Sequence, residues 1–130
     1  PDERWVAFTT LADPQWNLWI ASLRDGKVAG EKDWILVNAG LDERPWWSPD
    51  GNLLYTVSQR DGARCIWAQR LDPVTKRPKG HAFPVYHFHG SRVKVGPGLF
   101  MDFGPAILPD SLIFGLNQAS GNVWIAEPEK

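Results

Sequence analysis

The stretch Asp42-Glu43-Arg44-Pro45-Trp46-Trp47-Ser48-Pro49-Asp50-Gly51 runs directly into the apolar segment Leu53-Leu54-Tyr55-Thr56-Val57. Pro, Asp and Gly supply the backbone angles of a tight turn, and the residues on either side have the composition of short strands. A strand, a tight turn and a second strand form a β-hairpin. The sequence therefore predicts a hairpin here, and copies of the same pattern elsewhere extend the prediction to the whole chain.

The composition is that of a single globular domain. The chain has 130 residues, of which 43% are hydrophobic and 22% are charged, which is enough apolar material for a core. Its 14 basic and 15 acidic residues give a formal net charge of −1, which argues against binding to nucleic acid or to an anionic membrane surface. No run reaches the roughly 18 apolar residues of a membrane-spanning helix. The single cysteine, Cys65, can form no internal disulfide and is expected to be a small buried apolar residue.

Short strand-like segments separated by turns occupy the whole chain. The 11 prolines, 12 glycines and eight tryptophans are typical of aromatic-rich strands joined by frequent turns. Helical periodicity nowhere extends over more than about two turns, so we expect an all-β fold. The expected strands span residues 4–10, 16–23, 34–37, 44–48, 53–57, 65–71, 83–88, 99–103, 105–108, 112–116 and 122–126. Pro84 marks an edge strand, and residues 72–80, 90–98 and 117–121 are expected to be loops or connections.

The strand and turn patterns recur at a loose period. A tryptophan among small or aliphatic residues is found at Trp19, Trp67 and Trp124, at spacings of 48 and 57 residues. The Pro49-Asp50-Gly51 turn has a weaker copy, Pro109-Asp110-Ser111, 60 residues later. Repeats of about 40–50 residues with four short strands each are typical of β-propeller blades. The repeat therefore predicts several blade-like units.

The segment Trp47-Ser48-Pro49-Asp50-Gly51 resembles the turn of TolB-type β-propeller repeats, which joins the innermost strand of a blade to the second strand. The segment Leu108-Pro109-Asp110-Ser111 is similar to it in degraded form. The resemblance implies a partial β-propeller of about three four-stranded antiparallel blades. An incomplete blade would span residues 1–40, a complete blade 41–90 and another incomplete blade 91–130. It also implies the C-terminal part of a larger bacterial protein, with the periplasm or the outer side of the cell envelope favoured.

Three blades cannot form a ring, because propellers close with about 4–8 blades. An open stack would expose two large apolar blade faces, which soluble proteins avoid. We therefore expect that the remaining blades come either from a longer parent chain or from a second copy, in a six-bladed homodimer.

The resemblance implies a non-enzymatic platform for protein or peptide interaction or for sensing. The alternative is the accessory propeller domain of a prolyl-oligopeptidase-like peptidase whose catalytic domain is not among these residues. The sequence has no Gly-x-Ser-x-Gly nucleophile motif, and Cys65 has no histidine near it in the sequence. We therefore expect no enzymatic activity and no cofactor.

Four charged residues are candidates for ligand binding, namely Asp42, Glu43, Arg44 and Asp102. Ligands of propellers usually meet the mouth of the central channel, and the resemblance places these residues just before innermost strands. The alternative is that they are solvated loop charges, with Arg44 paired to a neighbouring blade, since exposed ion pairs are common and contribute little stability.

The tryptophans are expected to be mostly structural. Those that recur with the repeat are assigned to the core between blades. Trp46 and Trp47 are adjacent in one strand and must face opposite sides of it. Trp16 lies beside a loop and is the tryptophan most suited to an exposed protein contact.

His87 and His89 alternate along one strand, so their side chains lie on the same face, about 6.6 Å apart along the backbone. Such a pair can hold zinc if a third ligand is present. Neither a carboxylate nor a cysteine stands at ligand spacing beside them in the sequence. We therefore expect exposed edge-strand histidines and no metal site, with His87 and His89 as weak candidates.

Overall fold

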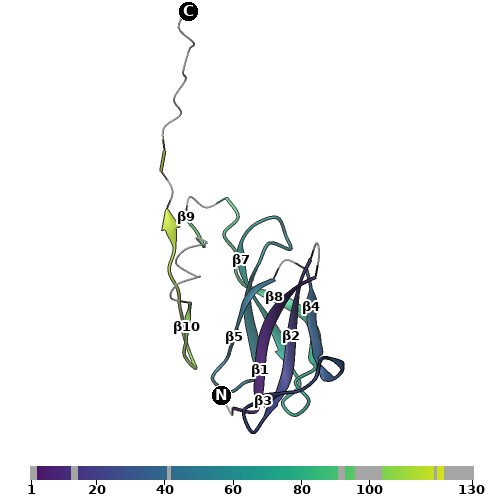
Figure 1. The fold of residues 1–130 in the computed structure, drawn as a ribbon. Helices are drawn as coiled ribbons and strands as arrows, with labels where there is room; N and C mark the ends of the chain where they lie inside the picture. The colour runs from purple at the N-terminus through teal and green to yellow at the C-terminus, as the bar shows by residue number, and fades with distance from the viewer. Residues whose placement is uncertain are drawn as a thin grey trace, which may run out of the picture.

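The computed structural model describes residues 3–12, 15–40, 42–90, 93–95, 104–118 and 120–121. Two four-stranded antiparallel sheets account for most of these residues, and two pairs of two-residue strands lie beside them (Figure 1). The 3₁₀ turn η1 (Glu31–Asp33) is the one helical element of the described ranges, which contain no helix long and apolar enough to cross a membrane. The predicted all-β fold with four-stranded antiparallel sheets is therefore confirmed.

The stretch around the Ser-Pro-Asp-Gly turn forms the first two strands of one sheet. Its strands β5 (Asp42–Trp47), β6 (Leu53–Ser58), β7 (Cys65–Leu71) and β8 (Pro78–Tyr86) pair in sequence order. Pro84 is tolerated because β8 pairs with β7 at the edge of the sheet. The predicted loop over residues 72–80 is wrong at its end, because Pro78 and Lys79 already pair with Leu71 and Arg70. An edge strand can carry such polar residues because its side chains face water.

Polar side chains fix the turn between β5 and β6. The Gly51 amide donates to the Ser48 carbonyl at 2.9 Å, and Gly51 has a φ of +68°, which costs glycine no steric strain. The buried Ser48 hydroxyl accepts a hydrogen bond from the Leu53 amide at 2.8 Å and donates to the Asp50 carboxylate. Lys76, whose side chain is buried, donates from Nζ to the Gly51 carbonyl at 2.7 Å. The turn sequence is therefore explained by backbone geometry and hydrogen bonding.

The other four-stranded sheet precedes this one in the chain. Its strands are β1 (Trp5–Ala12), β2 (Gln15–Arg24), β3 (Lys27–Val28) and β4 (Ile35–Ala39). β2 pairs with β1 on one side and with β3 and β4 on the other. An Asp-Gly turn joins β2 to β3, with Asp25 and Gly26 at φ values of +51° and +72°. The three strands predicted in this region are confirmed.

An apolar layer joins the two sheets. Leu18 and Ile20 of β2 are buried and pack with Leu54 of β6 and Leu71 of β7. Trp47 packs against the same cluster from β5. Burial of one leucine-sized or isoleucine-sized side chain contributes about 1.5–3 kcal/mol. This layer therefore holds the two sheets face to face.

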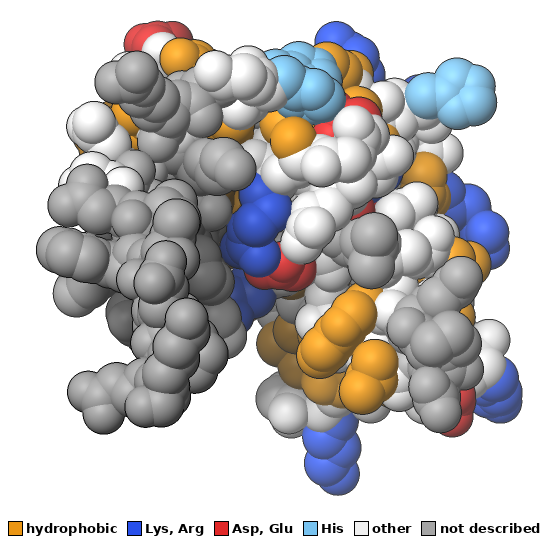
Figure 2. All heavy atoms as spheres, turned by 90° about the horizontal axis from the view of Figure 1, so that it is seen from above, with side chains coloured by type: hydrophobic (Ala, Val, Ile, Leu, Met, Phe, Trp, Pro, Cys, Tyr) orange, Lys and Arg blue, Asp and Glu red, His pale blue; other side chains and the backbone are white. Residues whose placement is uncertain are grey.

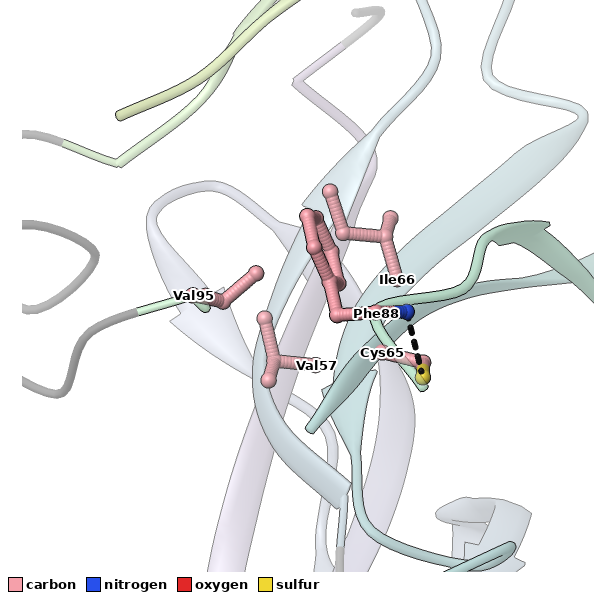
Figure 3. Close-up of a cluster of buried hydrophobic side chains, with 5 residues drawn as sticks. All are labelled: Val57, Cys65, Ile66, Phe88 and Val95. Carbon is pink, nitrogen blue, oxygen red and sulfur yellow. Dashed lines mark hydrogen bonds between the residues drawn. The ribbon is translucent and has the colours of Figure 1, made fainter. Parts of the chain in front are cut away.

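The opposite face of the β5–β8 sheet has a core of its own. The buried cluster consists of Val57, Cys65, Ile66, Phe88 and Val95 (Figure 3). Trp46 packs against this cluster, whereas Trp47 packs against the layer between the sheets, so the two adjacent indoles face opposite sides as predicted. Both faces of the β5–β8 sheet are therefore covered.

The C-terminal residues that the structure describes form two short strand pairs. β10 (Ala106–Ile107) and β11 (Leu112–Ile113) flank the weaker Pro-Asp-Ser turn, which is therefore also a hairpin. β9 (Val93–Lys94) pairs with β12 (Asn117–Gln118) in two segments predicted to be loops. Those predictions are wrong because a two-residue ladder leaves no periodic apolar pattern. The strands predicted at 99–103 and 122–126, including Trp124, lie outside the described residues, and no sheet within the described ranges closes on itself.

Candidate functional site

One end of the β5–β8 sheet gathers most of the polar side chains that the sequence singles out. Asp42 at the start of β5 lies opposite Ser58 at the end of β6, which in turn lies opposite Cys65 at the start of β7. Ile66 lies opposite Tyr86, the last residue of β8. The β6–β7 turn, residues 59–64, crosses the same end. The candidate residues are therefore brought together by the register of neighbouring strands.

Asp42 is a buried member of an ion pair. Its side chain is 2% exposed, and Nη2 of Arg60 lies 2.7 and 2.8 Å from its two carboxylate oxygens. Nδ2 of Asn38 donates to Oδ2 of Asp42 at 2.9 Å. The alternative that Asp42 is a solvated loop charge is therefore wrong, because its oxygens are already engaged by neighbouring donors.

Glu43 pairs with an arginine of the β6–β7 turn. Nη1 and Nη2 of Arg64 lie 2.5 and 2.9 Å from the two Glu43 oxygens, a two-point contact that also fixes the planes of both groups. The Glu43 side chain is 36% exposed and that of Arg64 is 22% exposed. This pair is therefore open to a ligand on one side.

Arg44 occupies an unusual backbone conformation. Its φ is +33°, and the β5–β6 register shifts between Glu43 and Trp46, as in a β-bulge. Bulges and left-handed non-glycine residues re-aim side chains and are frequent near binding sites. The irregularity therefore makes the surface beside Arg44 a candidate binding site.

A hollow of about 610 Å³ lies at this end of the molecule. Its walls come from the first sheet, from the start of β5 and from the β6–β7 turn, and they consist of Thr9, Trp16, Asp42, Glu43, Arg44, Gln59 and Arg64. Figure 2, which views the molecule from above, shows Lys or Arg side chains beside Asp or Glu side chains near the middle of this face. Three of the four predicted binding residues thus line one hollow, while Asp102 lies outside the described residues.

Trp16 forms the aromatic wall of this hollow. It is 44% exposed, as predicted from its position beside a loop. An indole has a large apolar face and an N–H donor, which suits it to contacts with another protein. The hollow therefore combines an aromatic surface with charged groups of both signs.

A second group of side chains lies at the same end of the sheet. Asp61, Cys65, His87 and His89 place one potential ligand atom each within 4.8 Å of all the others. Oδ2 of Asp61 lies 3.1 Å from Nδ1 of His87 and 2.9 Å from Nε2 of His89. Desolvation raises the pKa of the Asp61 carboxyl, but hydrogen bonds from His89 and from the Ala63 amide lower it by more. The net effect is a pKa below the ordinary value. The carboxylate is therefore available in its charged form.

The sequence pattern found only half of this second group. The predicted shared face of His87 and His89 is confirmed by their common contact with Asp61, but the prediction that both lie in the edge strand is wrong, because β8 ends at Tyr86. Asp61 and Cys65 stand more than 20 residues earlier in the chain. They reach the histidines because β7 and β8 are neighbours and the β6–β7 turn closes over their ends. The sequence signal that can find them is the pairing of the two strands, since Cys65 begins one and His87 follows the other.

Comparisons of this chain with protein-family models, with curated proteins and with solved structures find no match.

Proposed function

We propose that this chain is a segment of a TolB-type β-propeller and serves as a non-enzymatic binding platform for a protein or peptide. The ligand contacts the hollow between Trp16, the Glu43–Arg64 pair and Gln59. The observation that carries the proposal is the exposed indole of Trp16 in the wall of a hollow of about 610 Å³. A hollow of this size accommodates one or two side chains of a peptide.

The assignment to a propeller is supported by the order of the strands. A four-stranded meander that begins with a strand and a Ser-Pro-Asp-Gly turn is the expected blade unit, and the preceding sheet packs against it face to face. Propeller blades pack in this manner around a channel. The hollow then lies where the innermost strand β5 begins, which is the position expected for a ligand.

The walls of the hollow are held in place before a ligand binds. Arg60 fixes Asp42, and Arg64 fixes Glu43 through two contacts. Side chains that are already ordered lose little conformational entropy on binding. The ligand class that fits is a peptide with an aromatic, aliphatic or proline side chain for Trp16 and a polar group for the rim.

A displayed random-peptide library tests the proposal. We expect selection on the purified chain to enrich peptides that bind it. Trp16→Ala is expected to weaken the binding of these peptides by at least about 30-fold, since truncation of a tryptophan hot spot costs about 2 kcal/mol or more. Isothermal titration calorimetry measures both dissociation constants.

Leu36→Ala is the matched control, because Leu36 is 45% exposed on β4 and does not line the hollow. It is expected to leave peptide affinity within about twofold of the unaltered chain, a change of about 0.4 kcal/mol. The proposal is overturned if no peptide is enriched, or if Trp16→Ala and Leu36→Ala bind the enriched peptides equally well.

A further inference from the structure

We propose that Asp61, Cys65, His87 and His89 form a binding site for a zinc-type divalent transition-metal ion. The site is separate from the hollow proposed to bind a peptide, although both use the β6–β7 turn. It supplies four protein ligands to one ion and therefore has a structural role.

The distances among the four side chains support this site. Tetrahedral zinc has bonds of about 2.0–2.3 Å to N, O and S ligands, which places the ligand atoms about 3.3–3.8 Å apart. The four potential ligand atoms lie within 4.8 Å of one another, and the Asp61 carboxylate already lies about 3 Å from a nitrogen of each histidine. The histidine side chains are 45% and 48% exposed and can rotate to close the remaining gap. A shift of about 1 Å at most completes the geometry.

The donor set is selective for a particular class of metal. One thiolate, two imidazoles and one carboxylate suit Zn²⁺ and related first-row ions, whereas Ca²⁺ and Mg²⁺ require mainly oxygen ligands. On binding, the Cys65 thiol releases its proton to solvent, and the thiolate and the Asp61 carboxylate together balance the two charges of the ion. The complete site is therefore electrically neutral.

The backbone between the two histidines positions the cysteine. The Phe88 amide donates a hydrogen bond to Sγ of Cys65 at 3.4 Å (Figure 3), a contact that stabilises a thiolate and orients it. Phe88 itself is 4% exposed in the cluster with Val57 and Cys65. The histidines on either side of it are exposed, and both lie against the Asp61 carboxylate, so the two rings share one face.

Aromatic contacts restrict the histidine rings. The His87 ring lies 5.7 Å from the Trp67 ring and 5.1 Å from the His89 ring, in edge-to-face arrangements. His87 therefore has fewer rotations available than an isolated exposed histidine. This restriction lowers the entropy lost when the site closes on an ion.

The ion would connect the β6–β7 turn to the segment that follows the edge strand β8. Asp61 lies in the β6–β7 turn, and His87 and His89 follow the edge strand β8. Arg64 and Gln59 of the same turn line the peptide hollow. Metal binding is therefore expected to stabilise the turn and the wall of the hollow at the same time.

The test uses the full 130-residue chain, stripped of metal and then titrated with Zn²⁺, Co²⁺ and Mg²⁺. We expect one Zn²⁺ per chain with a dissociation constant below about 1 µM, a rise in melting temperature with Zn²⁺, and no response to Mg²⁺. Co²⁺ is expected to give the visible absorption of a tetrahedral ion and a thiolate-to-cobalt charge-transfer band.

The variants His87→Ala and His89→Ala are expected to weaken Zn²⁺ binding by at least about 100-fold, since loss of an outer-shell partner alone costs about 10- to 100-fold. His81→Ala is the matched control, because His81 is an exposed histidine of strand β8 that lies outside the group. Cys65→Ala is expected to abolish the charge-transfer band. Because Cys65 is buried in the core, the two exposed histidine variants keep the test valid if Cys65→Ala fails to fold.

The proposal is overturned if Zn²⁺ binds no more tightly than Mg²⁺, or if His87→Ala and His89→Ala bind Zn²⁺ as tightly as His81→Ala. It is also overturned if bound Co²⁺ shows octahedral absorption without a thiolate band. Removal of Zn²⁺ with a chelator is expected to restore the melting temperature of the metal-free chain.

Discussion

The charged residues at the end of the β5–β8 sheet form defined pairs with different exposures. Asp42 is buried and held by Arg60, which also lies 4.7 Å from the centre of the Trp67 ring. Glu43 and Arg64 are partly exposed, so solvent weakens their attraction. The buried pair is therefore expected to affect stability, whereas the exposed pair is expected to affect ligand binding.

Replacement of Arg60 by alanine is expected to destabilise the protein by about 2 kcal/mol. Removal of one partner of a buried ion pair costs about 3–5 kcal/mol because the other charge stays buried and unpaired, and we reduce this figure because the Arg60 side chain is 25% exposed. Urea unfolding followed by circular dichroism measures the change. Arg77→Ala, in an exposed loop, is the control and is expected to stay within about 0.5 kcal/mol of the unaltered chain.

A second substitution separates the buried charge from the loss of packing. In the Arg60→Ala background, Asp42→Asn is expected to restore part of the lost stability, because a neutral amide costs less to bury than a carboxylate. An Arg60→Ala variant as stable as Arg77→Ala would contradict the assignment of Asp42 as a buried charge that needs its partner.

Single residues show how far sequence patterns can predict a site. Asp42, Glu43 and Arg44 stand together at the start of β5, so their location at one end of the sheet is predictable. The partners Arg60 and Arg64 come from the following turn and become visible only when the β5–β6 register is known. The contact of Asp61 and Cys65 with the histidines is not predictable for the same reason, since spacing along the chain carries no information about pairing across strands.

At the scale of elements, the loop between β7 and β8 is held by one carboxylate. Oδ1 of Asp72 accepts hydrogen bonds from the amides of Val74 and Thr75, at 3.0 and 2.8 Å, and from the Thr75 hydroxyl at 3.0 Å. The backbone bond from Thr75, the hydroxyl bond from Thr75 and the backbone bond from Val74 lower the pKa of Asp72 from 3.8 to about 2. These bonds favour the charged carboxylate.

This depressed pKa predicts a specific loss of stability in acid. The unfolded chain binds a proton at Asp72 more readily than the folded loop does, so the contribution of Asp72 is fully present above about pH 4 and is lost as the pH falls through about 2. We expect the unaltered chain to lose stability between pH 4 and pH 2 more steeply than Asp72→Asn, which has no proton to bind at this position. Urea midpoints at pH 2, 3 and 4 measure both slopes.

Thr75→Val provides a graded comparison, because it removes the hydroxyl bond and keeps the amide bonds to Asp72. Its pH dependence is expected to lie between those of the unaltered chain and Asp72→Asn. Equal slopes for all three proteins would show that the loop does not respond to the charge of Asp72.

Elements with strong local signals were predictable, and those that depend on tertiary contacts were not. The turn at Pro49-Asp50-Gly51 is confirmed because it requires a backbone angle that glycine favours. The pairing of β9 with β12 was missed because their two-residue ladders are formed by chain segments far apart in sequence. Lys76 lies in a segment whose polar sequence predicts a loop, yet its side chain is buried against the Ser-Pro-Asp-Gly turn, which no periodic pattern indicates.

At the scale of the whole molecule, two apolar surfaces lack a covering layer among the described residues. The outer face of the first sheet carries Trp19 and Trp34, whose ring centres lie 5.9 Å apart, together with Leu36, which is 45% exposed. The β10–β11 region exposes Ile113 and Leu108, at 60% and 49%. Exposed apolar surfaces of this kind are typical of interfaces, and in a propeller they would contact neighbouring blades.

These two surfaces predict that the chain associates in solution. If the first sheet of each copy packs against the β10–β11 region of the other copy, the dimer has two equivalent interfaces. All four apolar surfaces are then buried, and the assembly is closed. We expect light scattering after size-exclusion chromatography to give twice the mass of one chain at micromolar concentration. Leu36→Lys and Ile113→Lys are each expected to return the mass to that of a single chain, because each introduces a charge into both interfaces.

Val74→Lys is the control for these variants, because Val74 lies in a loop at neither surface and is 80% exposed. It is expected to leave the mass unchanged. A stable, folded monomer of the unaltered chain would contradict this assembly, and it would also contradict the expectation that the blades need a neighbour, since their apolar faces would then tolerate water.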